Sequence, residues 1–583
     1  MRLKVTKSKN AASLYVIKSV YNPKTQSNSS KIVEKLGTEA ELREKLGGAD
    51  PYVWAKEYIQ ELNKKEKEDS RDVMIKCKQS KLLTKNEQHS FTGGYLFLQS
   101  IYHELGLNRI CRDIKDHYKF TFNLDMVLSR LIYGRILFPA SKLGTLQLSQ
   151  QLLEQPDFQI QHIYRALEVI AEKTDFIQAE LYKNSSSVSK RNDKILYYDC
   201  TNYFFEIEQE EGLKQYGPSK EHRSSPIVEM GLFLDGDGIP LAFSIHSGNT
   251  NEQTTLRPLE KTIIKDFQLS QFVVCTDAGL SSTQNRKFNN IGNRAFITTQ
   301  SVKKLKEHLK EWTLAKEGWL MYGDEGKHKY SLAELEDVEK NSPETLEIYK
   351  HSTFYKERWI KEDGLEQKLI VTYSIKYRNY QRQIRNSQIE RAQKLVSGNP
   401  SSIKKHHQND YKRFIQQTGV TADGEVACGD IFTIDAELIA REETYDGYYA
   451  VCTNLEDDAP AIVKINHRRW EIEESFRIMK SEFKARPVYL KRDDRIKAHF
   501  TTCFLALTVY RYLEKKLKEN YTSSEIIRTL RGMNFYKIPG EGYIPTYTRT
   551  DLTDALHESF GFRTDYQIVS MKQMKKNFKD TKK

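Results

Sequence analysis

The sequence predicts an α/β protein in which a mixed sheet forms the central domain and a helical region precedes it. Between about residues 92 and 185, apolar side chains recur at helical spacing. From Lys194 onward this spacing gives way to short runs rich in β-branched and aromatic residues, which is typical of strands. Helical segments separate the later runs, so some of the strands are expected to be parallel.

The bulk composition indicates several folded domains and a polyanionic partner. The chain has 583 residues, of which 38% are hydrophobic. Its 91 basic and 79 acidic residues leave a net charge of +12, which favours a polyanion over a small-molecule substrate or cofactor. We find no apolar membrane span and no N-terminal signal segment, so we expect a cytoplasmic protein that binds no membrane. Seven dispersed cysteines without a Cys-x-x-Cys pair favour reduced thiols.

Two regions are expected before the sheet and one after it. Residues 1–85 are predicted to form a hairpin arm and a charged connector. Residues 86–190 are predicted to form a helical domain that binds DNA, with a plain helical scaffold as the alternative. Residues 516–583 form a C-terminal region whose tail, 571–583, holds six lysines and one aspartate. We expect this tail to be a frayed basic extension.

The sheet itself is expected to begin within residues 191–302. Strands are predicted at 195–207, 227–234, 239–245, 272–276 and 294–299, with a helix at about 254–267. The turn Asp-Gly-Asp-Gly at 235–238 would join the second strand to the third as a hairpin. Antiparallel strands, a crossover helix and then parallel strands is the order of a ribonuclease-H-like sheet, so this segment is predicted to be the first part of such a catalytic core.

Residues 303–445 are expected to interrupt this core as an insertion that contains strands. Its predicted elements are helices at 303–314, 379–397 and 402–417 and strands at 368–373 and 432–434. The core is then expected to resume over residues 446–515. This second part would hold a strand at 448–453 and one continuous helix at 458–480.

Two aspartates stand where the predicted sheet would expose a site. Asp199 lies mid-way through the apolar run 195–207, where a lone buried charge is costly unless it is paired or bound to metal. Satisfaction by neighbouring hydroxyls or amides is the alternative. Asp277 directly follows a strand, and the carboxyl ends of strands are where α/β sheets place their sites. Its alternative role is to cap the next helix.

Glu473 is the third candidate, on the predicted helix 458–480. At about 100° per residue, it shares a face roughly 80° wide with the cations Arg469, Arg477 and Lys480. An apolar stripe adjoins this face, so the helix could dock by one side and present the charged side. Such a face suits a metal ligand beside bound phosphate. An ordinary amphipathic surface helix with ion pairs is the alternative.

Together, Asp199, Asp277 and Glu473 make an all-oxygen set, which selects Mg²⁺ or Mn²⁺ over zinc. Two such ions could activate a nucleophilic oxygen and stabilise the leaving oxygen of a phosphoryl transfer. These three residues are therefore the predicted catalytic residues and metal ligands. Glu471 and Glu474 point away from Glu473 on the helical wheel, so we choose Glu473.

At this point the chain resembles bacterial insertion-sequence transposases of the DDE type, in the insertion-sequence-four superfamily. Their third carboxylate sits in a Tyr-x2-Arg-x3-Glu-x6-Lys signature. Arg469, Glu473 and Lys480 reproduce the last three positions, whereas Asn466 occupies the tyrosine position. Other segments that resemble the family are 198–202, 217–223, 236–241, 248–250, 276–279 and 496–500.

The resemblance implies a ribonuclease-H-like domain with an insertion between the second aspartate and the glutamate. Here 196 positions separate Asp277 from Glu473. It also implies cleavage of double-stranded DNA at the terminal inverted repeats of an insertion sequence, followed by strand transfer into target DNA. A homodimer in the synaptic complex and a location at the bacterial nucleoid are implied as well.

The resemblance further implies which residues contact DNA. Arg469 and Lys480, together with Arg477, would bind phosphate and position the DNA end. Asn466 stands where relatives hold a phosphate with tyrosine, and its amide can still donate a hydrogen bond. A basic loop with Lys220, His222 and Arg223 is a further candidate, with a solvated loop as the alternative. Trp312, Trp319 and Trp359 are candidates for stacking on a flipped base, although core packing is the commoner role of tryptophan.

Two other functions stay open from the sequence. One is a metal-dependent nuclease or resolvase of the same fold that performs no strand transfer. The long insertion and the signature cations count against it, because such parts manage DNA ends. The other is a transposase-derived DNA-binding protein that has lost catalysis. Retention of all three carboxylates counts against it, while Asn466 keeps it open.

Overall fold

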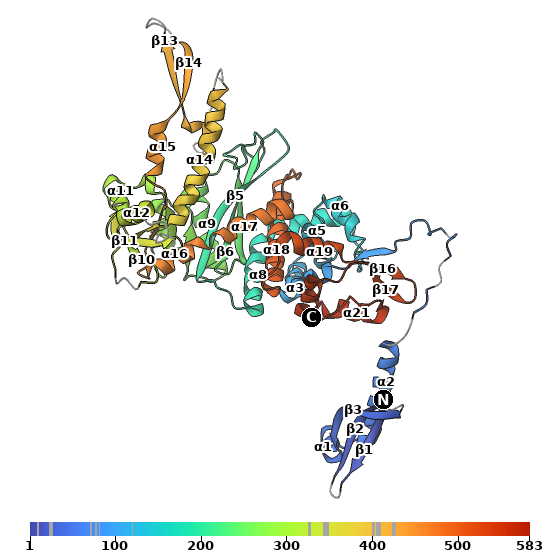
Figure 1. Ribbon diagram of the computed structural model, residues 1–583. Helices are drawn as coiled ribbons and strands as arrows, with labels where there is room; N and C mark the ends of the chain where they lie inside the picture. Colours follow the sequence, from blue (N-terminus) through green and yellow to red (C-terminus); the bar gives the residue numbers. More distant parts are fainter. Residues whose placement is uncertain are drawn as a thin grey trace. The chain divides into compact units, whose positions relative to one another are not determined.

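The computed structural model shows a chain of two compact units, Met1–Glu87 and Gln88–Lys583 (Figure 1). The residues that the structure describes are 1–8, 11–22, 27–69, 73–75, 78–80, 82–118, 120–324, 328–341, 349–398, 403, 410–421 and 427–583. Within them, no helix is both long enough and apolar enough to span a bilayer. Five cysteines in the described part of the chain are free and buried, namely Cys111, Cys200, Cys275, Cys452 and Cys503.

The first unit is a small antiparallel sheet backed by helices. Its elements are β1 (Arg2–Lys7), β2 (Ala12–Asn22), β3 (Ser27–Thr38), α1 (Glu39–Lys45) and α2 (Pro51–Asp69). β2 and β3 form the expected hairpin, although residues 23–26 of its turn lie outside the described residues. Thr38 begins α1 with a capping box, in which its hydroxyl accepts from the Glu41 amide and the Glu41 carboxylate accepts from the Thr38 amide.

The second unit opens with helices. These are α3 (Tyr95–Glu104), α4 (Leu107–Asp116), α5 (Leu124–Leu137), α6 (Lys142–Ser149), α7 (Ile160–Glu172) and α8 (Thr174–Val188). Of these, α3, α5, α7 and α8 pack around α18 (Asp493–Lys516), whose central residues are almost completely buried. The apolar stretch near residue 500 therefore forms a buried helix, as the sequence predicts. Because α18 also contacts the sheet, helices and sheet share one hydrophobic core.

The central sheet has nine strands in the order β10-β11-β12-β15-β9-β8-β5-β6-β7. The first five strands along the chain are β5 (Ile195–Phe204), β6 (Ile227–Asp235), β7 (Pro240–Ser247), β8 (Val273–Thr276) and β9 (Ala295–Gln300). β5, β6 and β7 are antiparallel neighbours, while β8 and β9 run parallel to β5. The helix α9 (Leu256–Asp266) makes the crossover. These elements lie where the sequence predicts them.

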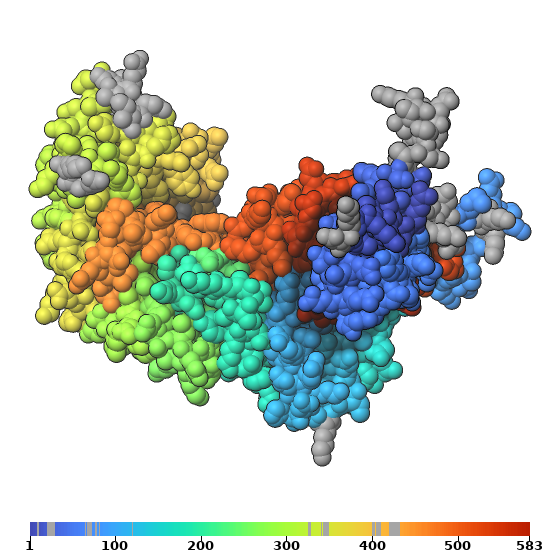
Figure 2. Space-filling view, turned by 90° about the horizontal axis from the view of Figure 1, so that it is seen from below, coloured from blue at the N-terminus to red at the C-terminus, as the bar shows by residue number. Residues whose placement is uncertain are grey.

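The expected insertion contributes strands to the same sheet. β10 (Leu320–Met321), β11 (Phe354–Glu362) and β12 (Leu365–Tyr373) join it through β15 (Tyr448–Thr453), which pairs with β12 on one side and β9 on the other. Residues 303–445 thus widen the sheet as well as interrupting its sequence. On the surface, the yellow-green inserted residues are continuous with the orange segment that follows them (Figure 2).

Two helices of the insertion, α11 (Glu307–Leu314) and α12 (Leu332–Asn341), pack with its strands, while α14 (Ile375–Ser397), the hairpin of β13 (Ile415–Thr421) and β14 (Ala427–Ile434), and α15 (Ala436–Glu443) project from the sheet (Figure 1). The helix predicted at 402–417 is wrong where the structure describes it. Residues 411–414 form a single 3₁₀ turn and β13 follows, while 404–409 lie outside the described residues. Burial of Phe414 and Ile415 against α14 overrides their local helical pattern.

The C-terminal region is folded to its end. β4 (Ser90–Thr92), β16 (Asn534–Ile538), β17 (Gly542–Pro545) and β18 (Val569–Ser570) form a four-stranded sheet, and α21 (Met571–Asp580) follows it. The frayed tail predicted at 571–583 is wrong, because Met574 and Asn577 are buried. The Asn577 amide donates to the Arg563 carbonyl at 3.0 Å, and Gln99 donates to Thr581 at 3.0 Å. The lysines of this tail are the solvent face of a docked helix.

The helix predicted at 458–480 is broken into three segments. α16 (Ala459–His467) ends before Arg468, α17 (Trp470–Arg477) begins after Arg469, and residues Ile478–Glu482 form one π-helical turn. A π-turn is wider than an α-turn, so it rotates Lys480 out of the helical wheel assumed from the sequence. Lys480 therefore no longer shares a face with Arg469, Glu473 and Arg477.

Candidate functional site

Asp199 and Asp277 lie on neighbouring parallel strands in the same register. Ile195 pairs with Val273 and Tyr197 with Cys275, and continuing that pairing places Asp199 opposite Asp277. Adjacent strands are about 4.8 Å apart, and residues two positions apart share a face. The two carboxylates thus form a row, with Asp199 in the middle of β5 and Asp277 directly after the carboxyl end of β8, and we call them the carboxylate row.

The carboxylate row faces the segment that carries Glu473. The Tyr197 hydroxyl donates to the Ile465 carbonyl at 3.0 Å, and the Tyr203 hydroxyl lies 3.7 Å from the Met479 sulfur. Asp199 lies between these tyrosines and shares their face, because side chains alternate along a strand. The residue thus points toward the middle of the α16–α17 segment, and α17 itself packs against β5 and β6. The opposite face of β5 packs against Thr255 before α9.

Asp199 is held in an environment that disfavours its charge. Burial raises the pKa of Asp199 to about 6. Lys220 counteracts this rise, the neighbouring charge of Asp277 adds to it, and Arg469 again lowers the pKa. The carboxylate accepts a hydrogen bond from its neighbour, the Cys200 amide, at 2.7 Å. A bound cation stabilises a buried carboxylate that lies next to a like charge, so the row suits a metal ion.

Asp277 caps the turn that follows β8. Its Oδ1 accepts from the Leu280 amide at 3.0 Å at the start of the 3₁₀ turn Ala278–Leu280. The capping alternative from the sequence is therefore confirmed. The same carboxylate also acts electrostatically on Asp199. The short turn fixes the side chain at the end of β8.

Glu473 is exposed and differs from the two other glutamates of α17. Glu471 pairs with Arg468 at 2.6 Å, and Glu474 pairs with Arg477 at 2.5 Å. For Glu473, by contrast, the described part of the chain offers no ion pair or hydrogen-bond partner. The helix thus leaves one carboxylate uncommitted, and it is the one that the sequence singles out.

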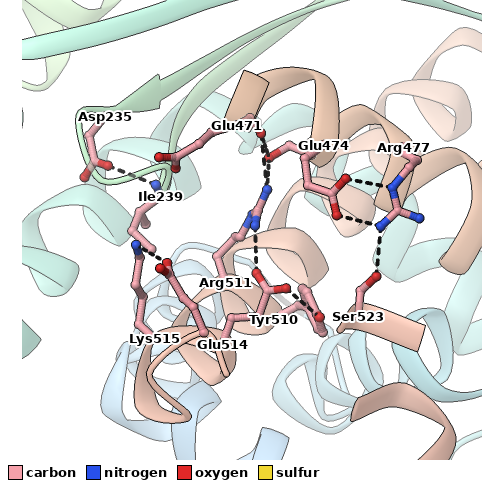
Figure 3. A network of polar contacts seen from close by, with 12 residues as sticks. Asp235, Ile239, Glu471, Glu474, Arg477, Tyr510, Arg511, Glu514, Lys515 and Ser523 are labelled. Atoms are coloured by element: carbon pink, nitrogen blue, oxygen red, sulfur yellow. Dashed lines mark hydrogen bonds and ion pairs between the residues drawn. The ribbon is translucent and has the colours of Figure 1, made fainter. Parts of the chain in front are cut away.

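The paired residues of α17 belong to a polar network that fixes this helix, shown in Figure 3. Arg511 on α18 donates to the Glu471 carbonyl at 3.2 Å and to Ser475 at 2.8 Å, and it pairs with Glu514 at 2.7 Å. Arg477 also donates to Ser523 on α19 (Ser523–Gly532) at 3.0 Å. We call Glu471, Glu474, Arg477, Arg511, Glu514 and Ser523 the anchor network.

Asp199, Asp277 and Glu473 offer the oxygen ligands that a hard divalent ion prefers, but the structure does not bring all three carboxylates together. Among the described residues, no group of three or more His, Cys, Asp or Glu side chains is arranged to hold a metal ion. Asp199 and Asp277 provide two carboxylates on one face of the sheet. Such oxygen donors suit Mg²⁺ or Mn²⁺. Glu473 on α17 would have to move toward these two carboxylates to become the third ligand.

Asn466 is buried and connects neighbouring elements through hydrogen bonds. It is 1% exposed, and its amide donates to the Tyr449 hydroxyl and, at 3.4 Å, to the Thr299 hydroxyl. The Cys275 thiol lies 3.3 Å from its carbonyl oxygen. Tyr449 and Thr299 are in turn 2.9 Å apart. A phenol from β15 therefore stands beside the position where the signature has its own tyrosine, and sequence spacing offers no signal for it.

The three predicted DNA-binding cations have different surroundings. Arg469 lies near Asn466 and makes one long contact of 3.4 Å to Thr299. Its buried Nε lacks a hydrogen-bond partner in the described structure. Lys480 is 3.6 Å from Glu221, a residue of the loop between β5 and β6. Arg477 belongs to the anchor network and points to Glu474 and Ser523. Arg469 and Lys480 thus lie near the carboxylate site or its loop, whereas Arg477 is committed elsewhere.

A cavity of about 820 Å³ opens behind the loop that carries the basic residues. Its lining includes Lys220, Arg223, Glu229 and Glu252. Lys220 pairs with Glu252 at 2.9 Å and donates to the Cys200 carbonyl at 2.5 Å, so it is fixed and not merely solvated. Burial, followed by the hydrogen bond with Glu252, raises the pKa of Glu229 to about 8. The sequence analysis overlooks both glutamates because no spacing connects them.

The tryptophan candidates separate by burial. Trp319 is fully buried and donates to the Ala315 carbonyl at 3.0 Å, so it is a core residue. Trp312 packs beside it, under Lys356 and Arg358. Trp359 is 45% exposed on β11. Of the three, Trp359 has the most surface to offer a ligand.

Comparison with known proteins identifies a family for this chain. The family model described as "Transposase DDE domain" matches residues 203–509. The match includes Asp277 and Glu473 and begins four residues after Asp199. The search of curated proteins finds no match.

Among solved structures, one similar chain is described as "Cryo-EM structure of piggyBac transposase synaptic complex with hairpin DNA". The similarity covers 76% of this chain and 82% of that chain, with 8% sequence identity and a TM-score of 0.35. The match to the family model, in contrast, spans more than half of the 583 residues. The protein belongs to the transposase DDE domain family.

Proposed function

We propose that this protein is an active DDE transposase that cleaves DNA at the terminal inverted repeats of an insertion sequence and transfers the strand into target DNA. One observation carries the proposal. Two carboxylates in register on adjacent strands face a helix whose one uncommitted glutamate is Glu473. Membership of the transposase DDE domain family supports the same chemistry.

Asp199, Asp277 and Glu473 are the proposed catalytic residues and ligands of divalent metal. Bound Mg²⁺ or Mn²⁺, as two ions, would supply activation of the attacking oxygen and stabilisation of the leaving oxygen. Because the pKa of Asp199 is raised to about 6, this carboxyl is protonated mainly below that pH and is mostly ionised near neutral pH, where a bound cation would stabilise its charge. Lys220 offsets part of the negative charge of the row before such a cation binds.

The residues around the row would hold the DNA backbone. Arg469 has a buried donor that lacks a partner among the described residues, which suits a phosphate oxygen. Tyr449 stands beside it, held by Asn466 and Thr299, so we propose that Tyr449 supplies the phenol that Asn466 lacks. Lys480 is the second proposed phosphate contact. Asn466 acts through Tyr449, and Arg477 acts mainly by fixing α17.

The domain organisation is part of the proposal. The strand order β7-β6-β5-β8-β9, with β8 and β9 parallel to β5, supports a ribonuclease-H-like catalytic core in two parts, 191–302 and 446–515. Residues 303–445 would be the insertion that shapes the DNA end. The helices of 86–190 would contribute to DNA binding, and 1–85 would form a separate arm and connector.

The proposed partners are double-stranded DNA, as element end and as target, and a second copy of the chain in the synaptic complex. The net charge of +12 supports a polyanionic partner. A bacterial insertion sequence as the source of the gene is part of the same proposal, because the signature run belongs to that group. Inverted repeats flanking the gene would support it directly.

The test is Mn²⁺-dependent cleavage of a DNA duplex that carries the element's end. Asp199→Asn, Asp277→Asn and Glu473→Gln should each abolish cleavage while DNA binding persists. Asp237→Asn, in the β6–β7 turn, is the matched control and should cleave normally. Full cleavage by Glu473→Gln would overturn the assignment of the third carboxylate.

A second assay separates the alternative functions. A pre-cleaved end is incubated with supercoiled target DNA, and joined products are measured. Joining by the wild-type protein is expected. Cleavage without joining would favour a nuclease or resolvase, and binding without cleavage would favour a catalytically inactive DNA-binding protein.

A further inference from the structure

Three cations meet around one carboxylate beside the end of β5. Glu221, in the loop between β5 and β6, lies 2.8 Å from Arg486, 3.6 Å from Lys480 and 3.9 Å from Arg223. The aromatic side chains that end β5 support these cations. Arg223 and Arg486 lie 4.1 and 5.5 Å from the Phe204 ring centroid. We call Lys480, Arg486 and Arg223 the cation trio.

The cation trio carries more positive charge than Glu221 neutralises. Burial lowers the pKa of Lys480, Glu221 raises it, and the nearby Arg486 lowers it again. In addition, the buried Nε of Arg486 has no hydrogen-bond partner among the described residues. The group is therefore an under-neutralised cation site with one donor still available. A built site with spare donors and spare charge indicates a second anionic ligand.

The site is open to such a ligand. The Lys480 side chain is 15% exposed, Glu221 22% and Arg486 27%, so the ion pairs border solvent. A carboxylate and a phosphodiester each carry one negative charge and present two terminal oxygens. Exchange of one for the other conserves the charge of the site, whereas burial of an extra anion beside Glu221 would set two like charges together.

We propose, on the basis of the proposed function, that Glu221 is an internal occupant of a DNA phosphate site formed by the cation trio. The incoming backbone phosphate displaces the Glu221 carboxylate and takes its place on Arg486 and Lys480. Glu221 thereby competes with DNA and weakens binding of any duplex that does not reach the site well. Arg486 and Arg223 become DNA contacts in addition to the residues of the signature run.

The displacement is coupled to the carboxylate row through the loop. Lys220, the residue before Glu221, donates to the Cys200 carbonyl and acts on Asp199. Displacement of Glu221 from the cation trio therefore acts on the residue next to a cation that partly neutralises Asp199. DNA binding at the trio and metal binding at the row are linked in this way, since both depend on the same loop.

The test measures the affinity of the full chain for a labelled DNA duplex by fluorescence anisotropy at several salt concentrations. Glu221→Gln removes the competing charge and retains the shape of the side chain. It should bind about tenfold more tightly at low salt, with the gain shrinking as salt rises. Glu208→Gln, an exposed position of the same loop, is the matched control and should change affinity by less than about twofold.

A second variant pair keeps the outcome unambiguous. Adding Arg486→Gln to Glu221→Gln should remove the gain, because the phosphate loses its closest donor. If Glu221→Gln binds no better than Glu208→Gln, or if the double variant keeps the gain, the inference is overturned. Thermal melting of each variant establishes that it is folded. Should Glu221→Gln fail while wild-type protein still cleaves DNA ends, the proposed function stands without this site.

Discussion

The charged side chains of α17 (Trp470–Arg477) differ in whether the fold gives them partners. Glu471, Glu474 and Arg477 belong to the anchor network, with partners on α18 and α19. Glu473, by contrast, is exposed and has no partner among the described residues. The difference teaches that the number of charges on a helix says little about function. What matters is which of them the fold has left without a partner.

The largest effect is expected from exchanging glutamate for glutamine at an unpaired and at a paired position of α17. Glu473→Gln should reduce Mn²⁺-dependent cleavage at least about a thousandfold, because a metal ligand is lost, and leave the thermal midpoint nearly unchanged. Glu474→Gln should retain most of the activity and instead lower the midpoint. Cleavage and melting are measured on the same preparations. Equal loss of activity in both variants would erase the contrast between the unpaired and the paired glutamate.

The next effect concerns the anchor network alone. Arg511→Met removes the hydrogen bonds to Glu471 and Ser475 and leaves Glu514 without its cation. We expect a loss of roughly 2–3 kcal/mol in the free energy of unfolding, since a buried charge loses its partner. Denaturant titration gives this value. A variant as stable as the wild type would show that the network does not hold α17 in place.

A smaller effect is expected where the row meets the DNA backbone. Tyr449→Phe removes one phenol hydroxyl, and affinity for a DNA end should fall about tenfold. Thr299→Val is the matched control, because it removes a neighbour of the same hydroxyl but no proposed phosphate contact. Anisotropy titrations compare the two. An equal decrease in both variants would point to a loss of packing and not of a contact.

The smallest effect is the stabilisation of the free protein by metal. At a concentration five times its dissociation constant, Mn²⁺ should add about 1 kcal/mol to the free energy of unfolding. Asp199→Asn and Asp277→Asn should lose this gain, whereas Glu474→Gln should keep it. Differential scanning fluorimetry with and without Mn²⁺ measures it. A gain that survives in Asp199→Asn would place the ion elsewhere.

Sequence patterns predict the central strands well because each strand carries its own local signal. Asp199 and Asp277 could be found for that reason, since each stands at a defined point of an apolar run. Their common register follows from the pairing of β5 with β8, which no local pattern states. The same limit hides Tyr449, whose hydroxyl reaches Asn466 only because β15 pairs with β9.

Failures of prediction arise where tertiary contacts decide. A helical wheel assumes one continuous helix, but here the helix is interrupted at Arg468 and Arg469 and becomes a π-turn at Ile478. Arg477 then donates a hydrogen bond to Ser523, and Lys480 forms an ion pair with Glu221. The basic tail shows the same effect, because α21 is stabilised by buried Met574 and Asn577 and not by its lysine-rich surface. Charge pattern alone cannot report such docking.

The most direct measurement is the position of Mn²⁺ in a complex of the protein with a DNA end, found from anomalous scattering. The account predicts manganese between Asp199 and Asp277, with the Glu473 carboxylate drawn in as a ligand and the anchor network unchanged. Manganese bound without Glu473, or bound by Glu229 and Glu252 in the neighbouring cavity, would contradict it.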